Sequence, residues 1–282
     1  WIQTCALPIS GNPNAGKTTI FNHLTGFRQR VGNYPGVTVE KKEGDAVYNG
    51  HRMPLVDLPG VYSLTPYTLE EVVTRRVLLE ERPAVVIDVL DATNVERNLY
   101  LAVQLKELGI PVVLALNMSD EARSKGIVFD LEKLGRLLGM PVVPTVGHKR
   151  EGLDKLLETV IEFAADKSLR KPLKINYGRD IEEALVRLRK MVEQSGALAD
   201  KVQPRWTAVK LLEGDNEVVE RVDDERLLMA AMEEANRLEK LLGESPATIM
   251  ADRRYGFISG ACQEAVRTTV ESRHTRSDKI DE

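Results

Sequence analysis

Short apolar runs alternate with amphipathic stretches in the first part of the chain, up to about residue 166. Three continuous apolar runs have the length of strands: "AVVIDVLDA" at 84–92, "PVVLALNMSD" at 111–120 and the shorter "PVVPTVG" at 141–147. Unbroken apolar strands are typical of a sheet that helices cover on both faces. The helices are predicted near 69–82, 94–108, 130–139 and 151–165. The pattern therefore predicts a mostly parallel α/β sheet with ligand loops at the carboxyl ends of its strands.

The start of the chain is less regular than this alternation. Residues 37–60, "VTVEKKEGDAVYNGHRMPLVDLPG", are predicted to form two strands joined at Asn49-Gly50, a dipeptide that suits a tight hairpin turn. By contrast, "WIQTCALPIS" at 1–10 is a poor first strand, because Pro8 lies inside it and has no N–H to donate.

The hydrophobic pattern changes from alternating strands and helices to helices alone after a predicted boundary near 166–172. One helical face then carries Ile181, Leu185, Leu188 and Val192. Further helical runs follow without a convincing strand between them, and Ser245-Pro246 is a good cap and first-turn pair for the last of them. Asp130 is a similar predicted cap in the first part of the chain. We predict a small all-helical domain after the α/β domain.

A phosphate-binding loop is predicted at residues 10–19, "SGNPNAGKTT", which have the spacing Gly-x4-Gly-Lys-Thr. Gly11 and Gly16 permit backbone conformations that turn consecutive N–H groups toward an anion. Lys17 is expected to reach the β- and γ-phosphates, and Thr18 to bind Mg²⁺ through its hydroxyl. A helix that begins near Lys17 directs its positive end at the same phosphates. The motif predicts a nucleotide but leaves the base open.

A second motif, "DLPG" at 57–60, ends a predicted strand. We expect Asp57 to meet Mg²⁺ through water and the N–H of Gly60 to meet the γ-phosphate. Glu70 and Glu71 open the helix that follows, where acidic residues favour the helix dipole. We therefore expect Glu70 and Glu71 to stabilise the start of the helix. A contact between these residues and the preceding loop is the second interpretation.

The base is predicted from "NMSD" at 117–120. Asp120 can accept from guanine N1–H and from the 2-amino group, a donor pair that adenine lacks. Asn117 can hold the loop and the edge of guanine, while Met118 stands where many GTPases carry lysine. "PTVG" at 144–147 follows and is expected to close over the base. The order of the motifs on successive strand ends predicts GTP and GDP as ligands.

The composition of the chain limits which partners the protein can bind and where in the cell we expect it. The 282 residues include 43 acidic and 39 basic ones, a net charge of -4, so no broad basic field favours nucleic acid and we expect no nucleic-acid partner. No apolar run reaches the roughly 18 residues of a membrane span, and we expect a soluble intracellular polypeptide. Neither the cysteines nor the histidines have the spacing of metal ligands. We expect two ordinary thiols, Cys5 and Cys262, and surface or packing histidines rather than an iron site, at His23, His51, His148 and His274.

These motifs, with several longer segments, resemble the cytoplasmic part of the FeoB family of bacterial ferrous-iron transporters. The segments are "RQRVGNYPGVTVEKKEG", "DLPGVYSLTPYTLEE", "RRYGFISGACQEAV" and "SDKID", and the resemblance runs from about Gly11 to the C-terminus. It implies a G domain, a helical domain that slows GDP release, and a membrane domain that conducts Fe²⁺. We expect the G domain at 1–168, the helical domain at 169–265 and a linker toward the membrane domain at 266–282. "PTVGHKREG" at 144–152 departs somewhat from the usual base-closing loop of the family.

The resemblance also implies roles for residues outside the generic motifs. Thr38 would coordinate Mg²⁺ only when GTP is bound. Asn14 matches an asparagine that helps to hold K⁺ beside the phosphates, and the carbonyls of Gly32 and Tyr34 complete that site. A cation is chemically reasonable there, because Val61 cannot orient water as the glutamine of Ras-like enzymes does and no arginine lies in an obvious finger position.

The expected site residues fall into three groups. We expect Lys17, Asn14, Thr38 and Gly60 to act in catalysis. The expected cation ligands are Thr18, Thr38 and Asp57 for Mg²⁺, and Asn14, Gly32 and Tyr34 for K⁺. The expected nucleotide contacts are Gly11, Asn12, Asn14, Ala15, Gly16, Lys17, Thr18, Thr19, Asn117, Met118, Asp120, Thr145, Val146 and Gly147.

The motifs are consistent with three alternative functions. The first is a slow, K⁺-stimulated GTPase that regulates Fe²⁺ uptake at the cytoplasmic face of the bacterial inner membrane. Its partner would be the membrane-embedded Fe²⁺ permease domain of the same parent chain, with homo-oligomers possible. The second is a soluble cation-dependent GTPase that acts in ribosome or RNA maturation. The third is a passive nucleotide-binding module with negligible turnover.

Overall fold

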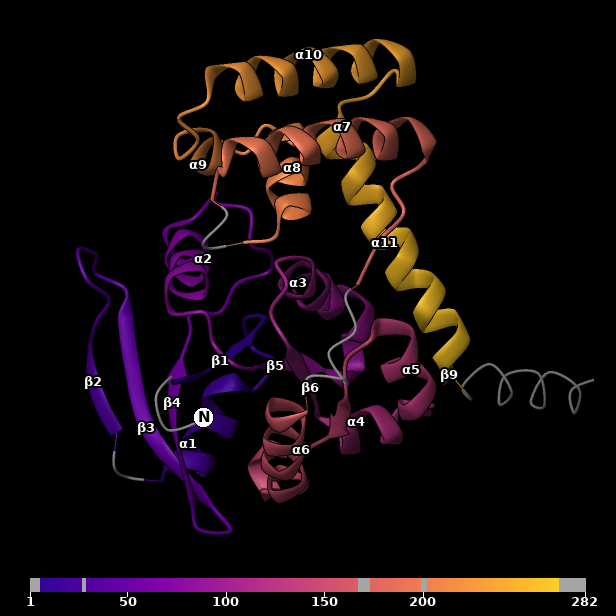
Figure 1. Cartoon of the computed structure of the whole chain (residues 1–282). Helices are drawn as coiled ribbons and strands as arrows, with labels where there is room; N and C mark the ends of the chain where they lie inside the picture. Colours follow the sequence, from indigo (N-terminus) through magenta and orange to yellow (C-terminus); the bar gives the residue numbers. More distant parts are fainter. Residues whose placement is uncertain (1–5, 27–28, 167–172, 199–201, 269–282) are drawn as a thin grey trace, which may run out of the picture.

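The first part of the chain folds around a seven-stranded sheet with the strand order β2-β3-β4-β1-β5-β6-β8 (Figure 1). The computed structural model describes residues 6–26, 29–166, 173–198 and 202–268. The strands are β1 (Leu7–Gly11), β2 (Gln29–Asn33), β3 (Glu40–Tyr48), β4 (His51–Asp57), β5 (Val86–Asp91), β6 (Val112–Asn117) and β8 (Val142–Pro144). Strands β4, β1, β5, β6 and β8 pair in parallel, while β2, β3 and β4 form an antiparallel ladder. The predicted mostly parallel sheet is confirmed.

Helices cover both faces of this sheet, as the unbroken apolar strands predict. The helices are α1 (Lys17–Thr25), α2 (Leu69–Glu81), α3 (Val95–Glu107), the short α4 (Ser119–Ser124), α5 (Leu131–Leu138) and α6 (Leu153–Ala165). α1 and α6 share one buried core with the strands, through side chains such as Phe21 and Phe163. α2, α3 and α5 lie in the core of the opposite face. The four expected helices correspond to α2, α3, α5 and α6, and Asp130 caps α5 by accepting from the N–H of Lys133 at 2.9 Å.

The predicted hairpin is also present. β3 and β4 are joined at Asn49-Gly50, and both turn residues have positive φ, 46° and 77°. Two such residues match the turn whose twist suits antiparallel strands. β2, which pairs with the outer edge of β3, was not predicted, because its sequence "QRVGN" is polar and mostly exposed and shows no apolar alternation.

The sequence left open whether residues 1–10 form the first strand, and the structure shows that Leu7–Gly11 do. β1 lies in the centre of the sheet, with Leu7, Pro8 and Ile9 in register with β4. Leu7 and Ile9 are fully buried in the core beneath α1 and α6. Pro8 removes one backbone donor, and the burial of its two apolar neighbours outweighs that loss.

The second part of the chain is helical. It contains α7 (Arg179–Ser195), α8 (Pro204–Leu212), α9 (Asn216–Val219), α10 (Glu225–Leu242) and α11 (Pro246–Ala265). The predicted apolar face of α7 is buried, as Ile181, Leu185, Leu188 and Val192 each expose 1% or less. Ser245 caps α11 and Pro246 occupies its first turn, as predicted. These helices share a continuous core with α2 and α3, so the helical region packs on one face of the sheet.

α11 runs from the helical region back along the first part of the chain to α5 (Figure 1). The strand that follows it, β9 (Val266–Thr268), pairs antiparallel with β7 (Ile127–Phe129), another strand that was not predicted. The N–H of Asp130 donates to the carbonyl of Ala265 at 2.8 Å, and Lys133 pairs with Glu264 at 3.0 Å. The first residues of the expected linker are thus bound to the α/β part. Residues 167–172 of the expected boundary near 166–172, and the remainder of the linker, 269–282, lie outside the described residues.

Across the residues that the structure describes, no helix combines the length and the apolar character needed to cross a membrane.

Candidate nucleotide-binding site

The phosphate loop connects the end of β1 to the start of α1, as the glycine spacing predicts. Gly16 has φ 87°, and a Cβ there would lie 2.2 Å from Nδ2 of Asn117. A Cβ on Gly11 would lie 2.5 Å from the carbonyl oxygen of Val89. Both positions therefore require glycine, for conformation and for space. α1 begins at Lys17, so its N-terminal N–H groups point into the loop.

Lys17 and Asp57 form an ion pair across the loop, although they are 40 residues apart in the chain. Their side chains are only 10% and 9% exposed. β1 and β4 are parallel neighbours, so their carboxyl ends bring the phosphate loop and the "DLPG" motif together. Gly60 lies against Pro13 of the loop, and the N–H of Val61 donates to the carbonyl of Gly11 at 3.3 Å.

Asn117 ties the phosphate loop to the base-closing loop. Its Nδ2 donates to the carbonyl of Ala15 at 2.9 Å, and its Oδ1 accepts from the N–H of Gly147 at 2.8 Å. The hydroxyl of Thr145 lies 3.4 Å from the same oxygen, and Ser119 donates its N–H to the Thr145 carbonyl at 3.2 Å. Asn117 is 3% exposed, so this support is built into the core of the site. The prediction that Asn117 holds the loop agrees with this geometry.

Asp120 lies at the start of α4 and already has two donors. Its Oδ1 accepts from the N–H of Glu121 at 3.0 Å, and its Oδ2 accepts from Nζ of Lys149 at 2.7 Å. The hydrogen bond from Lys149 is the largest cause of a lowered pKa of the Asp120 carboxyl. Lys149 was not among the expected site residues. Its only signal in the sequence is its position as the second residue after the predicted base-closing loop at 144–147.

The segment that should carry Mg²⁺ and K⁺ ligands lies partly apart from the phosphate loop. Tyr34 is 4% exposed, and its hydroxyl donates to the carbonyl of Asp57 at 3.2 Å. Gly32 lies on the exposed edge strand β2, opposite Lys41. Thr38 is exposed, and among the described residues no hydrogen bond joins it to the phosphate loop.

The remaining expected contacts line the loop itself. Asn12 is buried and accepts the N–H of Ala15 on its carbonyl at 3.2 Å. Asn14 is exposed and has a positive φ of 68°. Thr18 and Thr19 are exposed in the first turn of α1. The structure thus brings together the phosphate loop, the "DLPG" end and the base loops, but not Thr38 or Gly32.

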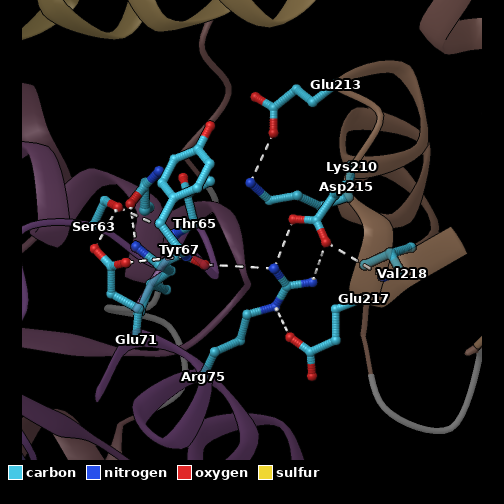
Figure 2. Close-up of polar contacts among 12 residues, drawn as sticks. Ser63, Thr65, Tyr67, Glu71, Arg75, Lys210, Glu213, Asp215, Glu217 and Val218 are labelled. Atoms are coloured by element: carbon cyan, nitrogen blue, oxygen red, sulfur yellow. Dashed lines mark hydrogen bonds and ion pairs between the residues drawn. The ribbon is translucent and has the colours of Figure 1, made fainter. Parts of the chain in front are cut away.

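The 61–71 segment after "DLPG" is ordered by Glu71, as Figure 2 shows. Its carboxylate accepts from the N–H groups of Tyr67 and Thr68 and from the hydroxyl of Ser63, at 3.0–3.2 Å. Thr68 returns the interaction by accepting the N–H of Glu71 at 3.3 Å, which completes a capping box at the start of α2. Glu71 therefore lies in the first turn of α2, as predicted, and also makes the contact with the preceding loop that was the second interpretation.

Arg75, one helical turn further along α2, reaches the helical region (Figure 2). Its guanidinium donates to both oxygens of Asp215, at 2.6 and 2.9 Å. Glu217 lies 3.5 Å from its Nε, and the ring of Trp206 lies 5.2 Å from its Cζ. No sequence motif indicated this contact, because its two halves are 140 residues apart.

A phosphate loop after β1, an Asp-x-x-Gly end on β4 and a base-reading loop after β6 define a P-loop GTPase domain, here followed by a helical region. Residues 5–160 match the family model described as ferrous iron transport protein B, and residues 177–267 match the FeoB cytosolic helical domain. The chain belongs to the FeoB family and comprises its GTPase domain and its cytosolic helical domain.

Individual relatives agree with this assignment. An Fe(2+) transport protein A/Fe(2+) transporter FeoB fusion protein of Porphyromonas gingivalis is 44% identical over 96% of this chain and 33% of the relative. A GDP-bound mutant of the S. thermophilus FeoB G-domain is 36% identical with a TM-score of 0.84, covering 94% of this chain and 100% of that one. The T. maritima FeoB cytosolic domain in its GMPPNP form is 32% identical with a TM-score of 0.79, covering 94% and 100%. The chain spans about a third of the length of the curated relatives that it matches.

Proposed function

We propose that this chain binds GDP and GTP and hydrolyses GTP slowly, as the regulatory module of a ferrous-iron transporter. The observation that carries the proposal is the position of Asn117, which joins the phosphate loop and the base-closing loop through two hydrogen bonds. One nucleotide can therefore contact both loops at once. GDP or GMPPNP in the two related structures supports the same class of ligand.

The proposed nucleotide contacts are those expected from the sequence. Phosphates would lie on the N–H groups between Gly11 and Thr19, with Lys17 as their cation. Asp120 would accept from guanine, and the 145–147 loop would close over the base. The glycine at position 16 supports this cradle, because any side chain there would meet Asn117.

The two cations are part of the proposal. Thr18, Asp57 and Thr38 supply oxygen ligands, which suit Mg²⁺, and the ion would neutralise charge on the phosphates. Asn14 with the carbonyls of Gly32 and Tyr34 supplies oxygen ligands for K⁺. For the Mg²⁺ site Thr38 must approach the phosphate loop, and for the K⁺ site Gly32 must do so. The segment that carries both residues would therefore move toward the loop when the nucleotide binds. Lys17, Asn14, Thr38 and Gly60 would then face the γ-phosphate.

The physiological partner would be an Fe²⁺ permease domain in the same parent chain, at the cytoplasmic face of the bacterial inner membrane. The length of the curated relatives supports this, since about two thirds of each lies outside the match. The helical region would slow GDP escape by restraining the 61–71 segment, a role that the buried Arg75–Asp215 contact supports.

Competition for a fluorescent GDP analogue tests the proposal. GDP and GTP should displace the probe and ATP should not, because adenine offers no donor pair to Asp120. Asp120→Ala should weaken GDP binding by about tenfold or more, since guanine loses its charged acceptor. Asp154→Ala, on the exposed face of α6, is the matched control. Equal displacement by ATP and GDP would contradict the proposal.

A further inference from the structure

Lys149 places an ammonium group directly beside the carboxylate that would read the base. Its Nζ donates to Oδ2 of Asp120 at 2.7 Å. The two side chains are 48% and 26% exposed, so the pair contributes little to the stability of the fold. None of the roles proposed above uses this lysine.

The backbone of Lys149 is held in place relative to Asp120. Val146 and Glu151 exchange two backbone hydrogen bonds, at 3.0 and 3.3 Å, and close the loop that contains Lys149. The N–H of Lys149 donates to the carbonyl of Val146 at 3.0 Å. Asn117 then fixes this loop to the strand end that precedes Asp120. The backbone of Lys149 is therefore fixed relative to the strand end that precedes Asp120.

Lys149 is the direct donor among the basic groups of this loop. Nε2 of His148 lies 3.9 Å from the same oxygen, which is beyond hydrogen-bond distance. An ammonium carries three N–H donors, so a lysine that donates to Asp120 can donate to a second acceptor as well. A carboxylate with an adjacent ammonium is a recognition group that both accepts and donates.

Guanine and xanthine differ at the position that this pair would face. Both have an N1–H donor, but guanine carries a 2-amino donor where xanthine carries a 2-oxo acceptor. A carboxylate alone repels that oxo group, whereas an ammonium between the two oxygens can donate to both. We propose that Lys149 lets this site bind xanthine nucleotides in addition to guanine nucleotides. The inference rests on the proposed function, because it places the base against Asp120.

Direct titrations of GDP and XDP, the xanthosine diphosphate, test the inference. Calorimetry, or displacement of a fluorescent nucleotide, compares the parent chain with Lys149→Met and Lys149→Arg. The control is Lys155→Met, on the exposed face of α6. Lys149→Met keeps the length of the side chain and removes the donor, so it should raise the ratio of the XDP to the GDP dissociation constant by about tenfold, as expected for one charge-assisted hydrogen bond. Lys149→Arg should keep most of the XDP binding, and Lys155→Met should match the parent chain.

The outcomes separate this inference from the proposed function. A chain that fails to bind GDP overturns the proposed function and this inference together. GDP binding with the same XDP to GDP ratio in the parent chain and in Lys149→Met overturns this inference alone. Tighter GDP binding in Lys149→Met without a loss of XDP binding also overturns it, because the lysine would then only compete with the base for Asp120.

Discussion

Arg75 and Asp215 form a bidentate ion pair that joins α2 to the helical region, with both side chains almost completely buried, at 1% and 3% exposed. Asp215 also accepts the N–H of Val218 at 3.3 Å and so caps α9. A buried charge that loses its partner is costly, much more so than the intact pair is stabilising. The helix after the 61–71 segment therefore cannot move away from the helical region without separating this pair or carrying Asp215 along.

Arg75→Met should accelerate the release of GDP severalfold, because it frees α2 and leaves Asp215 without its cation. The same change should lower the free energy of unfolding by about 3–5 kcal/mol, the range for breaking a buried pair. Stopped-flow release of a fluorescent GDP analogue and chemical denaturation measure the two effects. Arg75→Met/Asp215→Asn removes both charges, keeps the oxygen that caps α9 and should recover much of the stability.

Arg187→Met, which breaks an exposed pair with Glu234, is the control for this first prediction. Release of GDP at the parent rate from Arg75→Met, with the fold intact, would show that the helical region does not restrain nucleotide release through this contact.

GTP hydrolysis should be faster in K⁺ than in Na⁺, and Asn14→Ala should abolish the difference. Val61 is buried and aliphatic, so the position after "DLPG" offers no group to orient water or answer transition-state charge. A positive charge placed beside the transition state by an arginine finger raises the rate of hydrolysis by roughly 10³–10⁵. We expect K⁺ to supply such a charge here. Phosphate release in matched KCl and NaCl buffers measures the effect, with Asn22→Ala on α1 as the control. Identical rates in the two salts would remove the K⁺ site from the proposal.

The stability of the α/β part should fall as the pH rises toward 8, because of Asp88. This carboxyl on β5 is fully buried, and its desolvation raises the pKa to about 8. The folded state then binds more protons than the unfolded state between the ordinary carboxyl pKa and about 8, so unfolding becomes easier across that window and levels off above it. Asp88→Asn should flatten this dependence and raise the melting temperature at pH 8 more than at pH 5.

Thermal unfolding from pH 5 to pH 9 checks this prediction, with Asp252→Asn on the exposed side of α11 as the control. A parent chain and an Asp88→Asn variant with parallel profiles would show that Asp88 does not titrate in this range.

Glu71→Ala should loosen the 61–71 segment, because its carboxylate holds two N–H groups and one hydroxyl of that loop. Loss of the capping box at the start of α2 should cost about 1–2 kcal/mol in the free energy of unfolding. Denaturation measures the cost, and limited proteolysis near Tyr67 reports the loosened loop. Glu70→Ala, whose side chain is exposed beside it, should leave both unchanged.

The local features of this protein were predictable from its sequence. The spacing from Gly11 to Thr18, the "NMSD" run and the Asn49-Gly50 turn each depend on conformation and chemistry within a few residues, and each has the predicted place in the fold. The apolar runs at 84–92 and 111–120 likewise match strands β5 and β6, because a sheet covered on both faces buries such segments.

Contacts between distant segments were decided by the tertiary structure alone. Pro8 argued against a first strand, yet β1 is central because the core beneath α1 and α6 buries its neighbours. β9 exists only because α11 carries it to β7. Arg75 meets Asp215 across 140 residues, and Lys149 meets Asp120 through the loop that Val146 and Glu151 close. Short-range sequence patterns specify backbone conformation, whereas the partner of a charged side chain depends on how whole elements pack, and that is a property of the complete fold.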